Sequence, residues 1–184
     1  MHESLGLESG TVRVAPYDPA WPDLYTKEIA RLEPVLSAHG VSLAFEHTGS
    51  TAVKGLAAKP VLDILAGRRS DDERRLAISA LENAGYVFRG EQGIPGRDFF
   101  RRGQPRQYHI HLALIGSPFW EDHLAFRDYL RAYPETAAEY GRLKNDLMAR
   151  HPRDREAYTE AKTDFIQAVL RAAREGLAKR SPKR

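Results

Sequence analysis

Strand-like and helix-like hydrophobic periods alternate along this sequence of 184 residues, and the alternation restricts its possible folds. Apolar runs and period-2 patterns predict strands over residues 41–47, 61–66, 86–88, 98–101 and 107–115. Helical spacing predicts helices over residues 24–36 and 71–84, and then three more after Pro118, the last of which contains both Tyr158 and Phe165. Such a chain is predicted to form one α/β (α+β) unit with a C-terminal helical segment.

No repeat, low-complexity tract or linker divides the chain, so we expect a single domain over residues 12–178. We expect residues 1–11 to be a flexible N-terminus and residues 179–184 to be a basic, disordered tail. Cysteine is absent, which excludes disulfides, a cysteine nucleophile, a thiolate zinc site and an iron–sulfur cluster. No secretory signal and no apolar run of about 18 residues is recognisable, so a cytoplasmic location without membrane contact is expected.

The charge balance gives little support to a nucleic-acid partner. The net charge is only +3, from 28 basic and 25 acidic residues, and several positive charges lie in the last residues of the chain. The only basic stretch with interleaved aromatics is residues 97–106, which contains four arginines. We therefore expect a small-molecule ligand before a nucleic acid.

Gly49 and Ser50 follow closely after the predicted strand over residues 41–47. A strand that runs into a helix start leaves backbone N–H groups unpaired there, and such groups bind phosphate. Glycine lets the backbone approach a ligand closely, while the serine hydroxyl can either cap the helix or donate to a phosphate oxygen. An ordinary strand-to-helix turn with a serine cap is the alternative interpretation.

Asp63 lies in the middle of an apolar strand, where an uncompensated carboxylate would cost several kcal/mol. It must therefore pair with a cation, accept backbone hydrogen bonds or bind a metal. Lys59, four residues earlier, offers a purely structural salt bridge as one alternative. Ser50 and Asp63 are 13 positions apart, which allows one short helix and a return, so the loop and the acid can meet at the ends of adjacent strands.

His109 and His111 are two positions apart on the predicted strand over residues 107–115, so both project from the same face. Their Cα atoms are expected to lie about 6.6 Å apart. Together with Asp63 they could hold one ion, and a carboxylate with two imidazoles suits Zn²⁺, Mn²⁺ or Fe²⁺ better than Mg²⁺. The alternative is that both are polar residues at the mouth of a cleft. His47 is predicted to be a core histidine, whereas Glu46 faces the other way and is a candidate extra ligand or base.

The run EHTGSTAVKGLAAKPVLDI, residues 46–64, resembles the signature block of the GrpB family. Supporting segments are YDPAWP at 17–22, HIHL at 109–112, FRDYL at 126–130, and Tyr158 with Lys162 and Phe165. The resemblance spans about residues 12–170. It implies a nucleotidyltransferase-like mixed sheet flanked by helices, usually in a small cytoplasmic bacterial protein and sometimes in a domain fused behind dephospho-CoA kinase.

Nucleotidyltransferases of that superfamily carry a Gly-Ser loop, two acids two positions apart on a following strand, and usually a third acid on a later strand. Gly49 and Ser50 match the loop and Asp63 matches the first acid, but Leu65 stands at the second position. Two carboxylates are needed to hold the metals that bridge nucleotide phosphates. A single one offers Mg²⁺ too little charge for a two-metal site, which counts against catalysis.

The leading hypothesis is a protein that binds a nucleotide or another phosphorylated small molecule with a divalent metal, either Mg²⁺ or Mn²⁺, with Zn²⁺ as a further candidate. If it is catalytic, the reaction is nucleotidyl or phosphoryl transfer. The alternative is a non-catalytic ligand-binding or chaperone-like module with a protein partner, and a metal-dependent hydrolase is less favoured. The candidate residues are Asp63 and Glu46 for catalysis, Gly49, Ser50, Thr51, Lys59 and Arg127 for phosphate, and Asp63, His109 and His111 for the metal.

Overall fold

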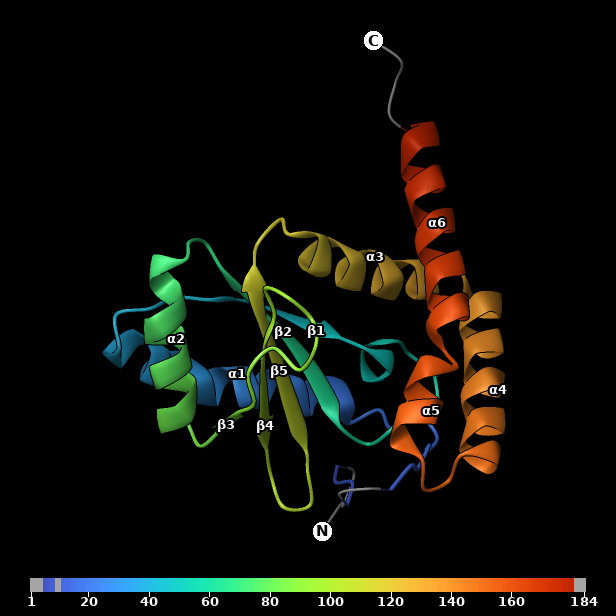
Figure 1. Cartoon of the computed structure of the whole chain (residues 1–184), viewed down its shortest axis with the longest axis horizontal. Coiled ribbons are helices and arrows are strands. Elements are labelled where there is room, and N and C mark those ends of the chain that lie inside the picture. The colour runs from blue at the N-terminus through green and yellow to red at the C-terminus, as the bar shows by residue number, and fades with distance from the viewer. Residues whose placement is uncertain (1–4, 9–10, 181–184) are drawn as a thin grey trace.

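The computed structural model describes residues 5–8 and 11–180. Its centre is a five-stranded sheet in the order β1-β2-β5-β4-β3 (Figure 1). The strands are β1 (Ala44–Thr48), β2 (Leu62–Arg68), β3 (Val87–Phe88), β4 (Asp98–Arg102) and β5 (Tyr108–Leu114). β2 and β5 run parallel, and the other neighbouring strands are antiparallel. The predicted mixed sheet is confirmed.

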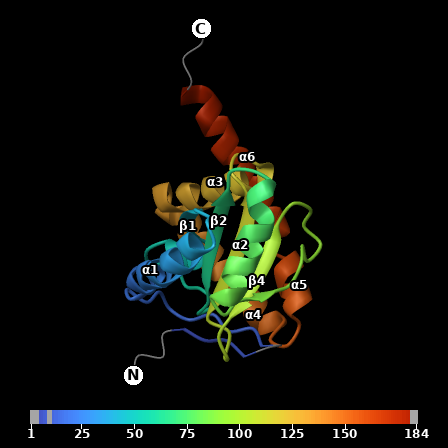
Figure 2. The ribbon, with the colours of Figure 1, turned by 90° about the vertical axis from the view of Figure 1, so that its left-hand side faces the viewer.

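Helices cover both faces of this sheet (Figures 1 and 2). On one face α1 (Trp21–Ala38) and α2 (Asp72–Asn83) pack against the main hydrophobic core. On the other face lies α3 (Pro118–Ala132), whose Trp120 ring packs so closely on Gly67 of β2 that a Cβ there would meet it at 2.7 Å. Beside α3 lies the predicted C-terminal helical segment, α4 (Pro134–Arg150), α5 (Arg155–Glu160) and α6 (Thr163–Arg180).

The strand alternation decides which side chains enter the core. Ile64, Phe100 and Ile110 are fully buried on the face covered by α1 and α2. Because successive side chains of a strand point to opposite faces, Asp63 and the two histidines of β5 must lie on the opposite face. This is the face on which α3 lies, and Asp63, His109 and His111 are grouped there.

The predicted elements differ from the structure in several bounds, and two of these differences have a clear physical reason. The first strand begins at Ala44 and not at residue 41, because pairing with β2 starts at Ala44↔Gly67, although Val41 and Leu43 are buried in the core. The predicted last helix is two helices, since the N–H of Lys162 bonds back to the carbonyl of Thr159 and closes α5 before α6 begins. Lys162 therefore lies at a junction between helices.

The predicted ends of the domain are described only in part. Within the segment predicted to be flexible, Leu5 and Leu7 are buried, and Leu7 forms a bridge with Arg106. Residues 1–4 and 9–10 lie outside the described residues. At the other end, α6 continues through Arg180, two residues into the predicted tail, and residues 181–184 lie outside the described part.

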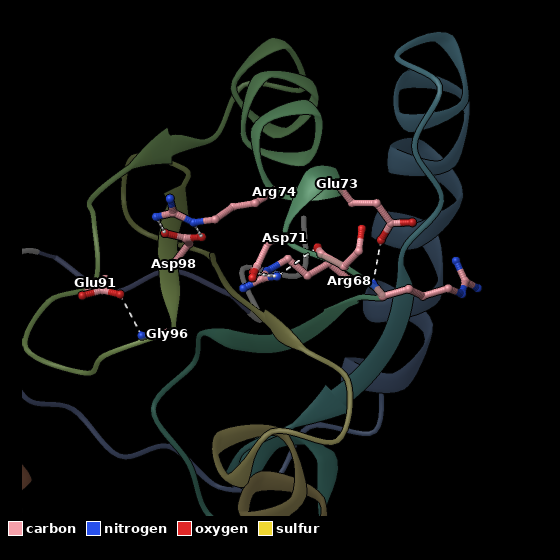
Figure 3. Close-up of polar contacts among 9 residues, drawn as sticks. Arg68, Asp71, Glu73, Arg74, Glu91, Gly96 and Asp98 are labelled. Atoms are coloured by element: carbon pink, nitrogen blue, oxygen red, sulfur yellow. Dashed lines mark hydrogen bonds and ion pairs between the residues drawn. The ribbon is translucent and has the colours of Figure 1, made fainter.

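Ion pairs join α2 and the segment just before it to strands of the sheet (Figure 3). Arg74 of α2 donates two hydrogen bonds, of 2.7 and 2.6 Å, to the carboxylate of Asp98 at the start of β4. Asp98 is buried, so this paired geometry compensates for the loss of water around its charge. Arg68, at the end of β2, contacts Asp71 just before α2 at 2.5 Å.

Candidate functional site

Asp63, His109 and His111 lie together on the face of the sheet covered by α3. The parallel register places Asp63 of β2 beside His109 of β5, and His111 is the next residue of β5 on the same face. His109 Nδ1 is 2.9 Å and His111 Nε2 is 3.5 Å from the same oxygen, Oδ1 of Asp63. One ligand atom from each residue lies within 4.8 Å of the other two. The residues predicted to share a site do converge.

Burial and mutual contact set the ionisation of these three groups. Burial by itself raises the pKa of Asp63, but the hydrogen bonds and charges of His109 and His111 outweigh it and hold that pKa well below its usual range. Burial lowers the pKa of His109 and of His111, although the carboxylate of Asp63 opposes the shift. Near neutral pH the cluster is thus one carboxylate with two neutral imidazoles.

Arg97 determines which nitrogen of His111 carries the proton. Its Nη1 lies 3.1 Å from Nδ1 of His111, and because a guanidinium can only donate, Nδ1 must accept. The neutral ring therefore keeps its proton on Nε2, which faces Asp63. The loop between β3 and β4 positions Arg97: its Nη2 donates to the carbonyl of Glu91 at 2.7 Å, and the Glu91 side chain accepts from the N–H of Gly96 (Figure 3).

Gly49 brings the main chain against Asp63 from the end of β1. Its φ of +67° is in the region that favours glycine, and a Cβ there would lie 2.7 Å from Oδ2 of Asp63. The helix start expected here is only one 3-10 turn, η1 (Ser50–Ala52), and its N-cap residue is Gly49 and not Ser50, so the turn has no side-chain cap bond. The turn is too short to present a row of unpaired helix N–H groups, so phosphate binding here needs other donors.

Those donors are three lysines around a neighbouring cavity of about 150 Å³. Its lining includes Gly49, Ser50 and Asp63 together with Lys59, Lys144 and Lys162. Phe126, Tyr140 and Tyr158 are among its apolar walls. The amines of Lys59 and Lys162 lie 4.0 and 4.5 Å from the centre of the Tyr158 ring. The cavity thus combines positive charge with aromatic walls, an environment suited to an anion.

Lys144 is not among the residues predicted from the sequence, and Lys162 is named there only as part of the family resemblance. Lys144 follows Tyr140 by four residues and precedes Leu147 by three, so it lies on the buried stripe of α4. It is only 3% exposed, and its Nζ donates to the carbonyl of Ala57. A lysine in line with an apolar stripe was the available signal.

Three other candidates have partners within the protein. Glu46 accepts a 2.6 Å hydrogen bond from Arg127, which also bonds to Asp128 and to the carbonyl of His47. Thr51 lines the cavity, but it is buried and its hydroxyl lies 3.0 Å from Nε2 of His47. These contacts fix the end of β1 and the turn that follows. Their predicted roles in catalysis and phosphate binding stay predictions.

His47 is a core histidine, as predicted. It is buried, and its ring stacks on Tyr25 of α1 with the ring centres 4.8 Å apart. Of the predicted arginine stretch, Arg97 and Arg106 are buried. The stretch is therefore not a fully exposed basic stripe.

The donors in the cluster suit one metal ion in kind and number, and do not suit two Mg²⁺ ions. Leu65, at the second acid position, is fully buried, so Asp63 is the only carboxylate among the three grouped residues. Arg97 lowers the affinity for that ion without blocking it, since a metal on Nε2 of His111 would move the ring proton to Nδ1, against the guanidinium. Metal-bound histidines normally donate their second N–H to an acceptor.

Comparison with known proteins agrees with the resemblance seen in the sequence. The family model described as GrpB protein matches residues 11–172. The chain belongs to the GrpB family. The crystal structure of a conserved protein GrpB from Enterococcus faecalis superposes with a TM-score of 0.80 and 34% sequence identity, covering 90% of this chain and 99% of that one. The fold described above is thus the family's fold.

Curated relatives differ in length. The glutamate-rich protein GrpB of Alkalihalophilus pseudofirmus is 31% identical over 172 residues, which is 90% of this chain and 98% of that protein. The protein YqkA of Bacillus subtilis is 36% identical over 159 residues, 86% of this chain, but this chain spans only 46% of it. A dephospho-CoA kinase of Mycolicibacterium paratuberculosis is 28% identical over 188 residues, 88% of this chain and 46% of that protein.

A more distant solved structure is that of Cid1, whose description gives it RNA terminal uridylyl transferase activity. It aligns with a TM-score of 0.47 and 14% identity, over 75% of this chain and 42% of that one, a likeness too remote to define what this chain does. Among the described residues, no helix has the length and apolar character that crossing a membrane requires.

Proposed function

We propose that this protein binds a nucleotide or a similar phosphorylated small molecule, with its phosphoryl groups in the cavity lined by Lys59, Lys144 and Lys162. The observation that carries this proposal is the convergence of three amines and the Ser50 hydroxyl on one small cavity beside Asp63. Ammonium and hydroxyl donors match phosphate oxygens, and charge-assisted bonds of this kind are about twice as strong as neutral ones.

We propose further that Asp63, His109 and His111 would hold one divalent ion, with Mn²⁺ or Zn²⁺ preferred over Mg²⁺ for a donor set rich in nitrogen. When bound, the ion would supply positive charge against the phosphoryl oxygens. The lysines that line the same cavity would orient the phosphoryl group and stabilise its charge. Nucleotidyl or phosphoryl transfer is the reaction that this arrangement would serve.

A non-catalytic binding module is the second candidate, and the buried Leu65 at the second acid position favours it. The match to part of a dephospho-CoA kinase fits either candidate, because a fused domain can bind a ligand without acting on it. The cytoplasmic location expected from the sequence stays a prediction.

Calorimetry and thermal unfolding with ADP, with and without Mn²⁺, test the binding proposal. ADP at about 100 times its Kd should stabilise the wild type by about 2.7 kcal/mol. Lys59→Met and Lys162→Met should each weaken ADP binding about tenfold, since each removes a charged donor. Lys54→Met is the matched control, because Lys54 is exposed and borders a different groove. No stabilisation by ADP or pyrophosphate, or an equal loss in Lys54→Met, would overturn the proposal.

Incubation with nucleoside triphosphates and Mn²⁺ separates transfer from binding. Pyrophosphate release that disappears in Asp63→Asn would support the transferase, while binding without any release would support the binding module.

A further inference from the structure

The size of the lysine cavity restricts what can enter it. Its volume of about 150 Å³ is well below the roughly 300–1,000 Å³ of pockets that hold whole drug-sized ligands. A phosphoryl group fits in such a space, whereas a nucleoside or another large organic group does not. A ligand with a phosphoryl end must therefore enter by that end, and its organic remainder must stay outside.

Lys144 lies at the buried side of this cavity. The groups that line the cavity with it come from several elements: Lys59 and Asp63 from β2 and the segment before it, Tyr158 from α5, Lys162 from the α5–α6 junction, and Tyr140 from α4 itself. Burial lowers the pKa of Lys144 to about 7, and the charges of Lys162 and Lys59 lower it in the same direction. Near neutral pH the empty site therefore contains both protonated and neutral Lys144.

An entering anion favours the charged form of Lys144, because its attraction for the ammonium group opposes the burial that lowers the pKa of Lys144. Two negative charges on a phosphoryl group would offset the repulsion among the three amines and stabilise the ammonium form of Lys144. A phosphomonoester, with a second ionisation near pH 6, carries that double charge at neutral pH. A phosphodiester carries a single charge and two organic substituents, so it matches neither the charge nor the size of the cavity.

We infer that the cavity accepts the terminal phosphoryl group of a phosphomonoester as its dianion, and that Lys144 takes up a proton when the group enters. This inference rests on the proposed function and specifies its ligand class: compounds that end in a phosphate monoester or a terminal phosphate, with diesters excluded. Lys144 is a binding residue in this scheme, and the fraction of it that is neutral in the empty cavity becomes protonated on binding.

Isothermal titration calorimetry of the full chain at pH 8 tests this inference, with methyl phosphate and dimethyl phosphate as probes. Repeating each titration in two buffers of different ionisation enthalpy gives the number of protons exchanged. Methyl phosphate should bind with uptake of about one proton, because Lys144 is mostly neutral at this pH. Dimethyl phosphate should bind at least about tenfold more weakly.

Lys144→Met should abolish the proton uptake and weaken methyl phosphate binding about tenfold or more, whereas Lys54→Met should change neither. If Lys144→Met does not fold, the number of protons that the wild type takes up on binding methyl phosphate still tests the inference. Methyl phosphate binding without proton uptake, or equal binding of the diester, would overturn this inference and leave the proposed function intact. Failure of both probes and of ADP to bind would overturn the proposed function itself.

Discussion

At the scale of single residues, the site depends on how closely the main chain at Gly49 approaches Asp63. No side chain larger than hydrogen fits there, because a Cβ would lie 2.7 Å from Oδ2 of Asp63. Gly55, six residues later, also has a positive φ, of +80°, but a Cβ added there would meet nothing within 4 Å. Substitutions at these two glycines therefore distinguish the cost of backbone strain, which both positions share, from the cost of close contact, which only Gly49 has.

Gly49→Ala should therefore lower the free energy of unfolding by roughly 2–4 kcal/mol, from strain and overpacking together. Gly55→Ala should cost only about 1–2 kcal/mol, from strain alone. Urea denaturation of both variants measures the difference. Equal costs would mean that contact with Asp63 does not constrain residue 49.

Arg97 offers a residue-level test of the metal hypothesis. Removing its guanidinium frees Nδ1 of His111 to carry the proton, which makes binding of an ion at Nε2 more favourable than in the wild type. Arg97→Leu should thus raise the affinity for Mn²⁺ or Zn²⁺ about tenfold, the lower end of the range for outer contacts of metal ligands.

Arg89→Leu is the control for this prediction, because it removes the same charge from an exposed position at the start of the same loop. Isothermal titration calorimetry with Mn²⁺ or Zn²⁺ gives the metal affinity of each of the two variants. An unchanged or lower affinity in Arg97→Leu would exclude Nε2 of His111 as a ligand atom.

At the scale of elements, the site is assembled by segments distant in the sequence. β2 and β5 supply the aspartate and the histidines, the end of β1 supplies the glycine turn, and α4 with the α5–α6 junction supplies two of the lysines. The loop after β3 contributes Arg97, and the Arg74–Asp98 pair holds α2 against β4 just beyond that loop (Figure 3).

Arg74→Met should lower the free energy of unfolding by about 2 kcal/mol, because it leaves the buried carboxylate of Asp98 without its bidentate partner. The partly exposed position of Arg74 keeps the cost below that of a fully buried pair. Arg75→Met, at the exposed neighbouring position, should have almost no effect. Equal unfolding midpoints for the two variants would contradict this role for the ion pair.

The hydrophobic periodicity of the sequence and the chemical character of single residues predicted much of this assembly. The alternating strands correctly put His109 and His111 on one face, and the interior carboxylate of Asp63 correctly drew attention to β2. The lysine cavity could not be predicted, because the contact between α4 and the segment before β2 depends on packing across more than 80 positions, as in the bond from Lys144 to Ala57. The break before Lys162 was equally hidden, since the helical period continues across it.

At the scale of the whole molecule, buried neutral histidines link stability to pH. Burial lowers the pKa of His47 to about 4, from a usual value of 6.5. Between these two values the unfolded chain binds a proton at His47 that the folded chain does not bind. Stability is therefore fully present above pH 6.5 and falls as the pH decreases, by up to about 1.4 kcal/mol per pH unit from this residue.

His47→Gln should remove this contribution, so its unfolding free energy should depend less steeply on pH between 6.5 and 4 than that of the wild type. Urea denaturation at several pH values gives the two slopes. Their difference should approach one proton, and identical slopes would show that His47 is not held neutral by its burial.

A crystal structure of the protein with ADP and Mn²⁺ would locate the ligand itself. We expect the terminal phosphoryl oxygens within hydrogen-bond distance of the Lys59, Lys144 and Lys162 amines, and an anomalous manganese peak beside Asp63. ADP bound at another surface while this cavity holds only water would contradict the proposed function.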